Sequence, residues 1–218
     1  MNNNENQEID TLSKVDLNSI KQPAVKKLIK KHISEGMDNF DDIVSTYKKG
    51  EDLSDYNIHR AIYNYPIDRD TVFEKYIVTN PSESWNGKLL SFGVLISKST
   101  HSVLYSGGSY EGAKAGQVLY LNLNLILGQF QLAVAHEIIG VNHEEKYMDL
   151  SYVVGAESVG MQHIEFIDNG DGTTTIKHTT HYKGESKFRD KYIYPYFHTK
   201  VVNDYHNNMR ITIMNANQ

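Results

Sequence analysis

The sequence predicts an α+β fold in which a curved antiparallel sheet wraps around a long C-terminal helix, with an N-terminal helical extension. Two observations lead to this prediction. Strand-like segments follow one another from about Lys88 to Tyr182 with no helix between them, and one amphipathic segment, Lys187 to Ile211, closes the chain. Strands that succeed each other without helices form antiparallel sheets. Because a terminal helix can lie across the concave face of such a sheet, we expect a cavity between the two.

The length of 218 residues suffices for one large domain, or for one domain with an extension. The hydrophobic content of 39% and the charged content of 22% are typical of a soluble globular protein. We divide the chain into residues 1–52, a tail with a helical extension, and residues 53–218, a ligand-binding domain.

Charge and cysteine content argue against several classes of function. The chain has 22 Lys and Arg against 27 Asp and Glu, a net charge of −5, and no basic stripe follows its strands. This argues against nucleic-acid binding. The absence of Cys excludes disulfides and thiol chemistry and fits a reducing compartment. The polar N-terminus lacks the features of a signal peptide, and no apolar stretch reaches the roughly 18 residues of a membrane span. We therefore expect a cytoplasmic protein.

The first 52 residues predict a tail and two helices. Residues 1 to about 14 are expected to be disordered. A helix begins near Gln22, with Pro23 in its first turn, and ends at Ser34. A second short helix is predicted over Asn39 to Tyr47, before Gly50. The first helix carries a basic cluster, which we interpret as a solvated face, with a partner-binding patch as the alternative. The cluster comprises Lys26, Lys27, Lys30, Lys31 and His32.

The main domain opens with a strand over Ile58 to Tyr65 and a short helix over Asp68 to Ile77. The clearest later strand is Gln117 to Ile126, where leucine occupies every second position from 119 to 125, as in a half-buried strand. The Asn169–Gly172 segment is a strong hairpin signal. The predicted strands are Leu89–Ile96, Ser102–Tyr105, Gln117–Ile126, Phe130–Val141, Tyr147–Val154, Gly160–Ile167 and Thr173–Tyr182.

The closing segment predicts one helix with an apolar stripe of Ile193, Phe197, Val201, Tyr205 and Ile211 or Thr212. Pro195 should either kink this helix or mark its true start. The tyrosines that flank the proline either form the lip of the cavity or pack where the helix meets the sheet. They are Tyr192, Tyr194 and Tyr196.

The order of strand, short helix, meander and long C-terminal helix resembles the helix-grip fold of the START/Bet v 1-like (SRPBCC) superfamily, which includes polyketide cyclases and aromatases. The residues that carry the resemblance are His59–Phe73, the Asp168–Thr173 hairpin and the terminal amphipathic helix. The resemblance covers roughly residues 56 to 213 and implies a cavity for lipids, sterols, hormones or polyketide chains. Some members only carry a ligand and others dehydrate or cyclise it, and no invariant catalytic motif defines the superfamily.

Three polar side chains are the candidates to act in this cavity. His136 and Tyr152 each continue an apolar strand face, and Tyr205 continues the apolar stripe of the closing helix. Buried polar side chains need hydrogen-bond partners, so these groups could bind or polarise a ligand carbonyl, or could simply be satisfied by the protein. The residues expected to line the cavity are Phe130, Leu132, Val134, Met148, Leu150, Phe197 and Val201.

The remaining histidines give weaker signals. His136 and His143 are seven residues apart on a strand and turn, which places them on opposite faces, so no metal site is expected. A hairpin centred on Gly170 and Asp171 would place His163 opposite His178, as a possible proton-transfer pair. The apolar residues Ile164 and Phe166 alternate with His163 and are expected to point inward, which favours a solvent-facing position for His163. The orientation of His178 stays open.

Three functions are compatible with these patterns. The first is a cyclase or aromatase acting on an acyl or polyketide-like chain, including one bound to a carrier, in which a tyrosine hydroxyl polarises a carbonyl and His136 transfers a proton. Catalysis would come mainly from positioning and would need no metal or redox cofactor. The second is a non-catalytic binder or carrier of a lipid-like molecule. The third is an interaction module whose N-terminal helices form a homodimer or partner surface.

Overall fold

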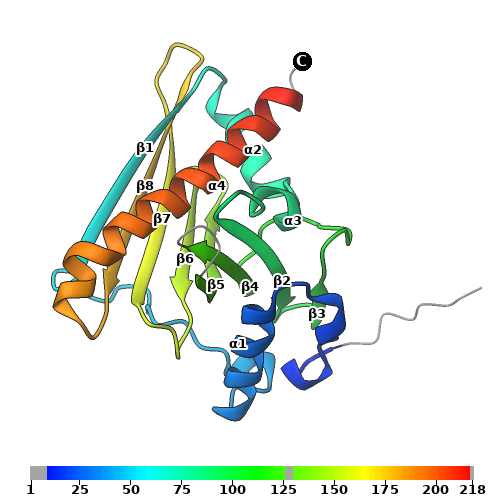
Figure 1. The fold of residues 1–218 in the computed structure, drawn as a ribbon. Helices are drawn as coiled ribbons and strands as arrows, with labels where there is room; N and C mark the ends of the chain where they lie inside the picture. The colour runs from blue at the N-terminus through cyan, green and yellow to red at the C-terminus, as the bar shows by residue number, and fades with distance from the viewer. Residues whose placement is uncertain (1–8, 126–129, 217–218) are drawn as a thin grey trace, which may run out of the picture.

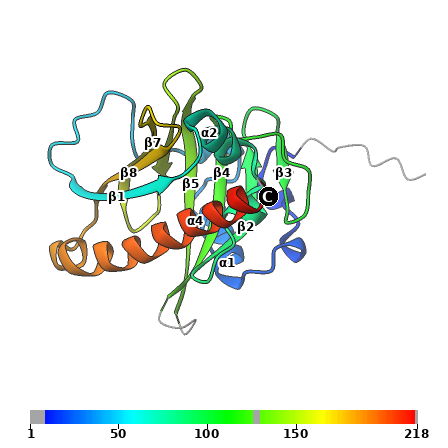
Figure 2. The same ribbon diagram turned by 90° about the horizontal axis from the view of Figure 1, so that it is seen from above.

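The computed structural model describes residues 9–125 and 130–216, and these form one antiparallel eight-stranded sheet with helices on both faces. The strand order is β1-β8-β7-β6-β5-β4-β2-β3. Figure 1 shows the C-terminal helix α4 (Tyr194–Ala216) crossing the sheet obliquely, and Figure 2 shows it running from β1 toward β2. The predicted α+β architecture, a curved sheet around a long C-terminal helix, is confirmed.

The strands agree with the predicted segments to within a few residues at their ends. They are β1 (Asn57–Tyr65), β2 (Leu90–Ser97), β3 (Ser102–Leu104), β4 (Gln117–Leu125), β5 (Phe130–Asn142), β6 (Tyr147–Tyr152), β7 (Val159–Asp168) and β8 (Thr174–Lys183). Residue 126, predicted as the end of a strand, lies outside the described residues.

Three helices cover the concave face of the sheet. These are α2 (Arg69–Val78), the four-residue α3 (Pro81–Ser84) and α4. The Asp68 side chain accepts a hydrogen bond from the Thr71 backbone N–H and so caps α2. The side chains of the three helices and the inward face of the sheet form one core. It includes Val72, Phe73, Leu90, Leu119, Leu150, Ile164, Phe166, Ile176, Met209 and Ile213.

The N-terminal segment covers the opposite, convex face of β2, β4 and β5 and forms a second core there. Helix α1 (Pro23–Ser34) buries Val25 and Ile29 against the sheet. Strand β4 is consequently buried on both faces: Leu119 and Leu121 face the concave core, and Val118 and Tyr120 face the convex one. The prediction of a half-buried β4 was therefore wrong, because periodicity within β4 carries no information about which distant segment covers its second face.

Glycine permits the close approach of α1 to the sheet. A β-carbon at Gly93 would lie 2.8 Å from Val25 Cγ1 and 2.9 Å from the Tyr120 carbonyl oxygen. The pairing of β2 with β4 is irregular at this point, between Phe92 and Val94. The division of the chain at residue 52 stays a prediction, but residues 9–43 share a core with the sheet.

Two predictions for the N-terminal segment were wrong. Residues 9–14 are ordered rather than disordered, because the Leu12 side chain is buried and its N–H donates to the Asp38 carbonyl oxygen at 2.7 Å; residues 1–8 lie outside the described residues. The predicted helix Asn39–Tyr47 is only a 3₁₀ turn over Phe40–Asp42. The chain beyond it is extended because its backbone hydrogen-bonds to the end of β6, with Thr46 N–H donating to the Tyr152 carbonyl oxygen at 2.7 Å.

The β7–β8 hairpin is shifted by one residue from the predicted pairing. His163 lies opposite Thr179, and His178 lies opposite Ile164. The loop contains five residues between the Asp168–Thr174 pair, so its centre is Asp171 rather than the Gly170–Asp171 bond. Because opposite residues share a face, this register turns His178 inward with Ile164 and leaves His163 on the convex face.

Helix α4 begins where Pro195 predicted. A π-helical turn over Arg189–Ile193 precedes it, and the proline is its second residue. The buried stripe is Val202, Tyr205, His206, Met209 and Ile213, which shares only Tyr205 with the predicted set. The predicted residues are mostly four positions apart, and four residues turn a helix of 3.6 residues per turn by about 400°. Their side chains therefore move progressively around the helix instead of staying on one face. Among the described residues, no helix is long and apolar enough to cross a membrane.

We predict that Ile29→Ala lowers the free energy of unfolding of the whole domain by about 2–5 kcal/mol, because it opens a cavity in the convex core. The measurement is urea unfolding followed by circular dichroism. Lys30→Ala, on the exposed side of the same helix, is the control and should change stability little. A separate early transition in Ile29→Ala, with the main transition unchanged, would instead show that the N-terminal segment unfolds independently.

Candidate functional site

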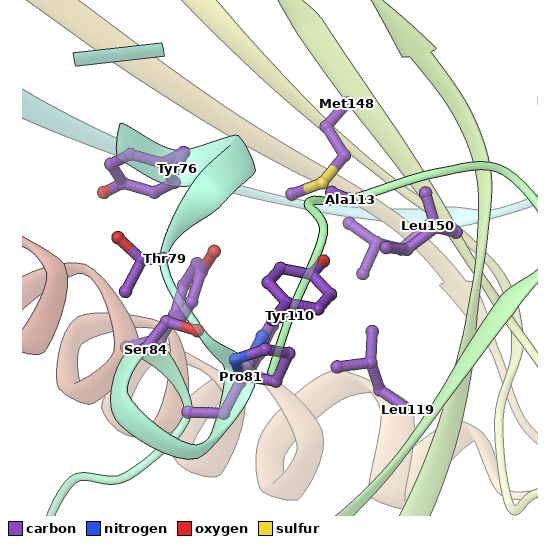
Figure 3. Close-up of a pocket in the computed structure, with 12 residues that line it drawn as sticks. Tyr76, Thr79, Pro81, Ser84, Tyr110, Ala113, Leu119, Met148 and Leu150 are labelled. Carbon is purple, nitrogen blue, oxygen red and sulfur yellow. The ribbon is translucent and has the colours of Figure 1, made fainter. Parts of the chain in front are cut away.

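A small hollow lies between the sheet, α3 and α4 on the concave side. The volume that the centre of a water molecule can reach in this hollow is about 10 Å³. The hollow therefore has room for a single water molecule. Figure 3 shows Tyr110 between the α2–α3 side of the hollow and the strand residues Leu119, Met148 and Leu150. The lining is mainly aromatic and aliphatic. It comprises Tyr76, Thr79, Pro81, Ser84, Trp85, Tyr110, Ala113, Leu119, Ile138, Met148, Leu150 and Tyr205.

Aromatic stacking closes this hollow on the helical side. Tyr205 on α4 stacks on Trp85, which follows α3, with ring centroids 3.9 Å apart and 16° between the planes. The edge-to-face pair of Tyr205 with Tyr76 on α2 adds a third ring at 5.8 Å. Side chains rather than backbone therefore fill the space in which the sequence predicts a cavity.

Polar contacts hold α4 over the hollow. The Asp204 carboxylate accepts hydrogen bonds from the backbone N–H groups of Lys88 at 3.1 Å and Leu89 at 2.8 Å. A β-carbon at Gly87 would overlap this carboxylate, so glycine is required there. The Asn208 amide donates to the Ser84 carbonyl oxygen at 3.0 Å. These contacts fix the position of α4 relative to the loop that leads into β2.

A buried chain of hydrogen bonds links α4 to the sheet and to α2. His178 Nε2 is 2.8 Å from Gln162 Oε1, His206 Nε2 is 2.9 Å from His178 Nδ1, and the Tyr76 hydroxyl is 2.8 Å from His206 Nδ1. The Gln162 oxygen can only accept, so His178 Nε2 donates and neutral His178 accepts from His206 at Nδ1. His206 in turn accepts from Tyr76. The chain is therefore complete only when both histidines are neutral.

Burial favours this neutral state. It lowers the pKa of His206 to about 3 and, together with the neighbouring His206, lowers the pKa of His178 well below its ordinary value. The same cause lowers the pKa values of His198 and His59, whose Nδ1 atoms lie 3.2 Å apart at the β1 edge of α4. Four histidines thus lie in or beside the interface of α4 with the sheet in uncharged form.

His136 and Tyr152, which were each expected to face inward, lie together on the concave face, a contact that was not predicted. They are paired across β5 and β6, and their ring centroids are 4.8 Å apart. The Tyr152 hydroxyl hydrogen-bonds to the Tyr194 hydroxyl at the start of α4, and burial raises the pKa of Tyr152. Burial lowers the pKa of His136 to about 4. Both groups are therefore neutral near pH 7.

Both ring nitrogens of His136 are buried and lack a hydrogen-bond partner within the part of the chain that the structure describes. The side chain is only 7% exposed. Its cross-strand neighbour Leu119 and its same-face neighbour Ile138 both line the hollow. His136 itself is not a lining residue, but its unpaired donor and acceptor lie next to two residues that are, whereas most buried polar atoms in proteins are paired.

The predicted lining residues are spread over the concave face. Met148 and Leu150 line the hollow, and Val134 and Val201 pack against the concave core. Leu132 and Phe197 are half-buried, and Phe130 is 52% exposed near the β4–β5 connection, so it is not part of the buried wall. Tyr205 is buried in the Trp85 stack, on the helical side of the hollow. The site roles of all these residues stay predictions.

Trp85, Tyr110 and His206 were not predicted as site residues, and the orientation of His178 was not decided from the sequence. His206 carried a readable signal, because 202, 205, 206, 209 and 213 follow the spacing of a helix face. Trp85 and Tyr110 lie in connections, where no periodicity reports burial. His178 needed the hairpin register, which depends on the loop length.

Other candidate sites are less favourable. An open groove of about 840 Å³ lies on the convex side between the N-terminal segment and β5–β6. The charged groups at its floor satisfy one another: Glu137 accepts from Lys98 at 2.8 Å and from Ser45 at 2.6 Å. Within residues 9–125 and 130–216, no group of three or more His, Asp or Glu side chains could hold a metal ion.

We predict that the protein loses stability as the pH falls from about 7 to about 4. The pKa values of His136, His178 and His206 lie below the ordinary 6.5, so the unfolded chain binds more protons than the folded one in this range. Their contribution is fully present above pH 6.5 and is lost on acidification, by up to about 1.4 kcal/mol per pH unit for each histidine. Urea unfolding at several pH values measures this slope.

Replacement of one buried histidine should reduce the slope. At pH 5 we expect the His206→Gln variant to take up about one proton fewer on unfolding than the unmodified chain does. At pH 7 we expect the variant to be less stable than the unmodified chain. His163→Gln is the control, because His163 lies partly exposed on the convex face beside Asp149. An equal slope in His206→Gln and the unmodified chain would contradict a neutral, buried His206.

Comparison with known proteins places this geometry in a known fold. No protein-family profile matches the sequence, and no curated protein sequence matches it. Norcoclaurine synthase from Thalictrum flavum is similar in structure, with a TM-score of 0.54, 14% identity, and coverage of 79% of this chain and 96% of that one. A protein from Thermus thermophilus has a TM-score of 0.53 at 10% identity, covering 74% and 100%. Major latex-like protein 151 from Panax ginseng has a TM-score of 0.50 at 15% identity, covering 71% and 97%. The chain thus has the helix-grip fold that these solved structures share.

Proposed function

We propose that this protein binds a small hydrophobic molecule with a polar group between the concave face of the sheet and α4. The observation that carries the proposal is the pair of unpartnered nitrogens on buried His136, whose neighbours Leu119 and Ile138 line the hollow. Leaving a buried polar group unpaired costs about 1–3 kcal/mol. A ligand hydroxyl or carbonyl at His136 would remove this cost, while its apolar part contacts the aliphatic lining.

The ligand must displace side chains to enter, because the hollow has room for one water only. The rings of Trp85, Tyr110 and Tyr205 fill the space on the helical side. These rings belong to α4 and to two connections rather than to the sheet, and Trp85 is already partly exposed. We infer that they form the movable wall of the site.

Binding is favoured over acid–base catalysis. A general base works best when its pKa lies near the working pH, and burial lowers the pKa of His136 to about 4. Neutral His136 can still donate one hydrogen bond and accept another, which suits recognition. Norcoclaurine synthase was solved in complex with dopamine and hydroxybenzaldehyde, so this fold holds small polar aromatic molecules in at least that protein.

The second candidate is a cyclase or aromatase acting on an acyl or polyketide-like chain. The contact between His136 and Tyr152 supports it, since a protonated phenol could polarise a carbonyl while the imidazole accepts a proton. A carrier-bound substrate and a homodimer stay predictions. Identification of the small molecule that copurifies with the protein, by solvent extraction and mass spectrometry, distinguishes a reactive poly-carbonyl chain from an inert lipid-like ligand.

We predict that His136→Phe weakens ligand binding about fivefold to a hundredfold while leaving the protein at least as stable, because it removes a hydrogen-bonding group that the fold leaves unpaired. Anilinonaphthalene sulfonate is the probe, and the single tryptophan, Trp85 in the wall of the hollow, supplies a second fluorescence signal.

His163→Phe is the matched control, since His163 lies on the convex face and should leave affinity unchanged. Unchanged probe affinity in His136→Phe, or a loss of stability in that variant, would count against the proposal. Turnover of an extracted poly-carbonyl ligand that is abolished in His136→Phe would favour the cyclase instead of the binder.

A further inference from the structure

An exposed aromatic stripe precedes and begins α4. Phe188, Tyr192 and Tyr196 are spaced four residues apart, and they are 66%, 56% and 56% exposed. The rings of Phe188 and Tyr192 are in contact, with centroids 5.3 Å apart. These three residues are here called the aromatic stripe. The segment 188–196 that carries them lies at the end of the molecule where the chain leaves β8, away from α2 and α3 (Figures 1 and 2). They take no part in the hollow or in the buried hydrogen-bond chain.

Lysines flank the aromatic stripe. The Lys191 ammonium lies 5.2 Å from the Tyr192 ring centroid, and that of Lys200 lies 4.1 Å from the Tyr196 ring centroid. Lys200 also donates a hydrogen bond to the Tyr196 hydroxyl at 2.6 Å. Residues 183–200 carry five basic and two acidic side chains, and so a net charge of +3, on a chain whose net charge is −5. Positive charge is thus concentrated at the stripe.

Of the two acidic side chains in this segment, Glu185 is exposed and Asp190 is neutralised. Asp190 is only 5% exposed, accepts from Arg189 at 2.9 Å, and accepts from the Gly184 backbone N–H at 2.7 Å. It is therefore part of the turn that joins β8 to α4 rather than of the outer surface. Lys187 and Lys191 remain exposed on either side of Phe188.

This combination of residue types fits one kind of surface. Tyrosine and phenylalanine favour the boundary between lipid headgroups and acyl chains, and adjacent lysines are attracted to anionic headgroups. A protein partner would be expected to bury such rings in a pocket with a polar rim. An exposed row of rings with lysines beside them instead suits a flat anionic layer.

We propose that the aromatic stripe and its lysines dock this protein onto an anionic membrane surface. Phe188, Tyr192 and Tyr196 enter the headgroup boundary to a depth of about 5–10 Å, and the lysines contact the headgroups. The inference goes beyond the ligand site and does not depend on it, because the stripe and the hollow share no residue.

Cosedimentation of the full chain with vesicles tests the proposal. One set of vesicles contains phosphatidylcholine alone, and the other contains about a third phosphatidylserine. We expect binding to the anionic vesicles that weakens as salt is added. Lys187→Gln/Lys191→Gln should lower the partition coefficient about fivefold for each lysine removed, and Phe188→Ser/Tyr192→Ser should lower it at least tenfold.

Ile211→Ser is the matched control. Ile211 lies on the same helix and is 61% exposed, but it lies outside the stripe, so its replacement should not change vesicle binding.

The proposal is overturned if the unmodified chain does not bind anionic vesicles, if it binds both vesicle types equally, or if Ile211→Ser loses as much binding as the stripe variants. It is also overturned if light scattering shows a dimer that Phe188→Ser/Tyr192→Ser converts to monomer, since the stripe would then be a contact between two copies. Circular dichroism of each variant checks the fold, and the charge variant keeps every ring in place.

Discussion

The docking of α4 on the concave face depends on hydrogen bonds between uncharged groups. Tyr76, His206, His178 and Gln162 come from α2, α4, β8 and β7, and each member satisfies the next. In a low-dielectric interior an unpaired member is costly, so the chain specifies one position of the helix more sharply than apolar contacts alone would do. The same arrangement makes protonation unfavourable, which ties the interface between helix and sheet to the neutral form of its histidines.

The sheet supports a core on each face, and aromatic rings on the concave side leave only a small hollow. Residues 9–43 cover the convex face of β2, β4 and β5, so these strands are held from both sides. On the concave face, α3 and the loop after it bring Trp85 onto Tyr205, and the stacked rings occupy the space beneath α4. The proposed ligand site lies between the sheet, which is covered on both faces, and this wall of aromatic side chains. The unpartnered His136 lies on the sheet side.

The sequence predicted the strands better than it predicted their environment. Alternation in β4 and the glycine-rich hairpin signal at Asn169 were local properties, and both gave the correct elements. The loop length in that hairpin was misjudged by one residue, which was enough to exchange the neighbours of His163 and His178. His136 and Tyr152 were expected to face inward because strand alternation is a local property, but their contact across β5 and β6 was not predicted. Trp85 and Tyr110 were missed, because irregular segments have no period.

The sequence by itself determined the order of elements, the antiparallel sheet and the terminal helix, since periods of 2 and 3.6 residues and turn-forming residues are recorded locally along the chain. Tertiary structure alone decided that the N-terminal segment covers the convex face, that aromatic rings close the hollow, and that His178 meets His206. Each of these depends on contacts between residues far apart in the chain, such as the 28 residues that separate the two histidines. Such contacts follow from how whole surfaces fit together, which no local pattern encodes.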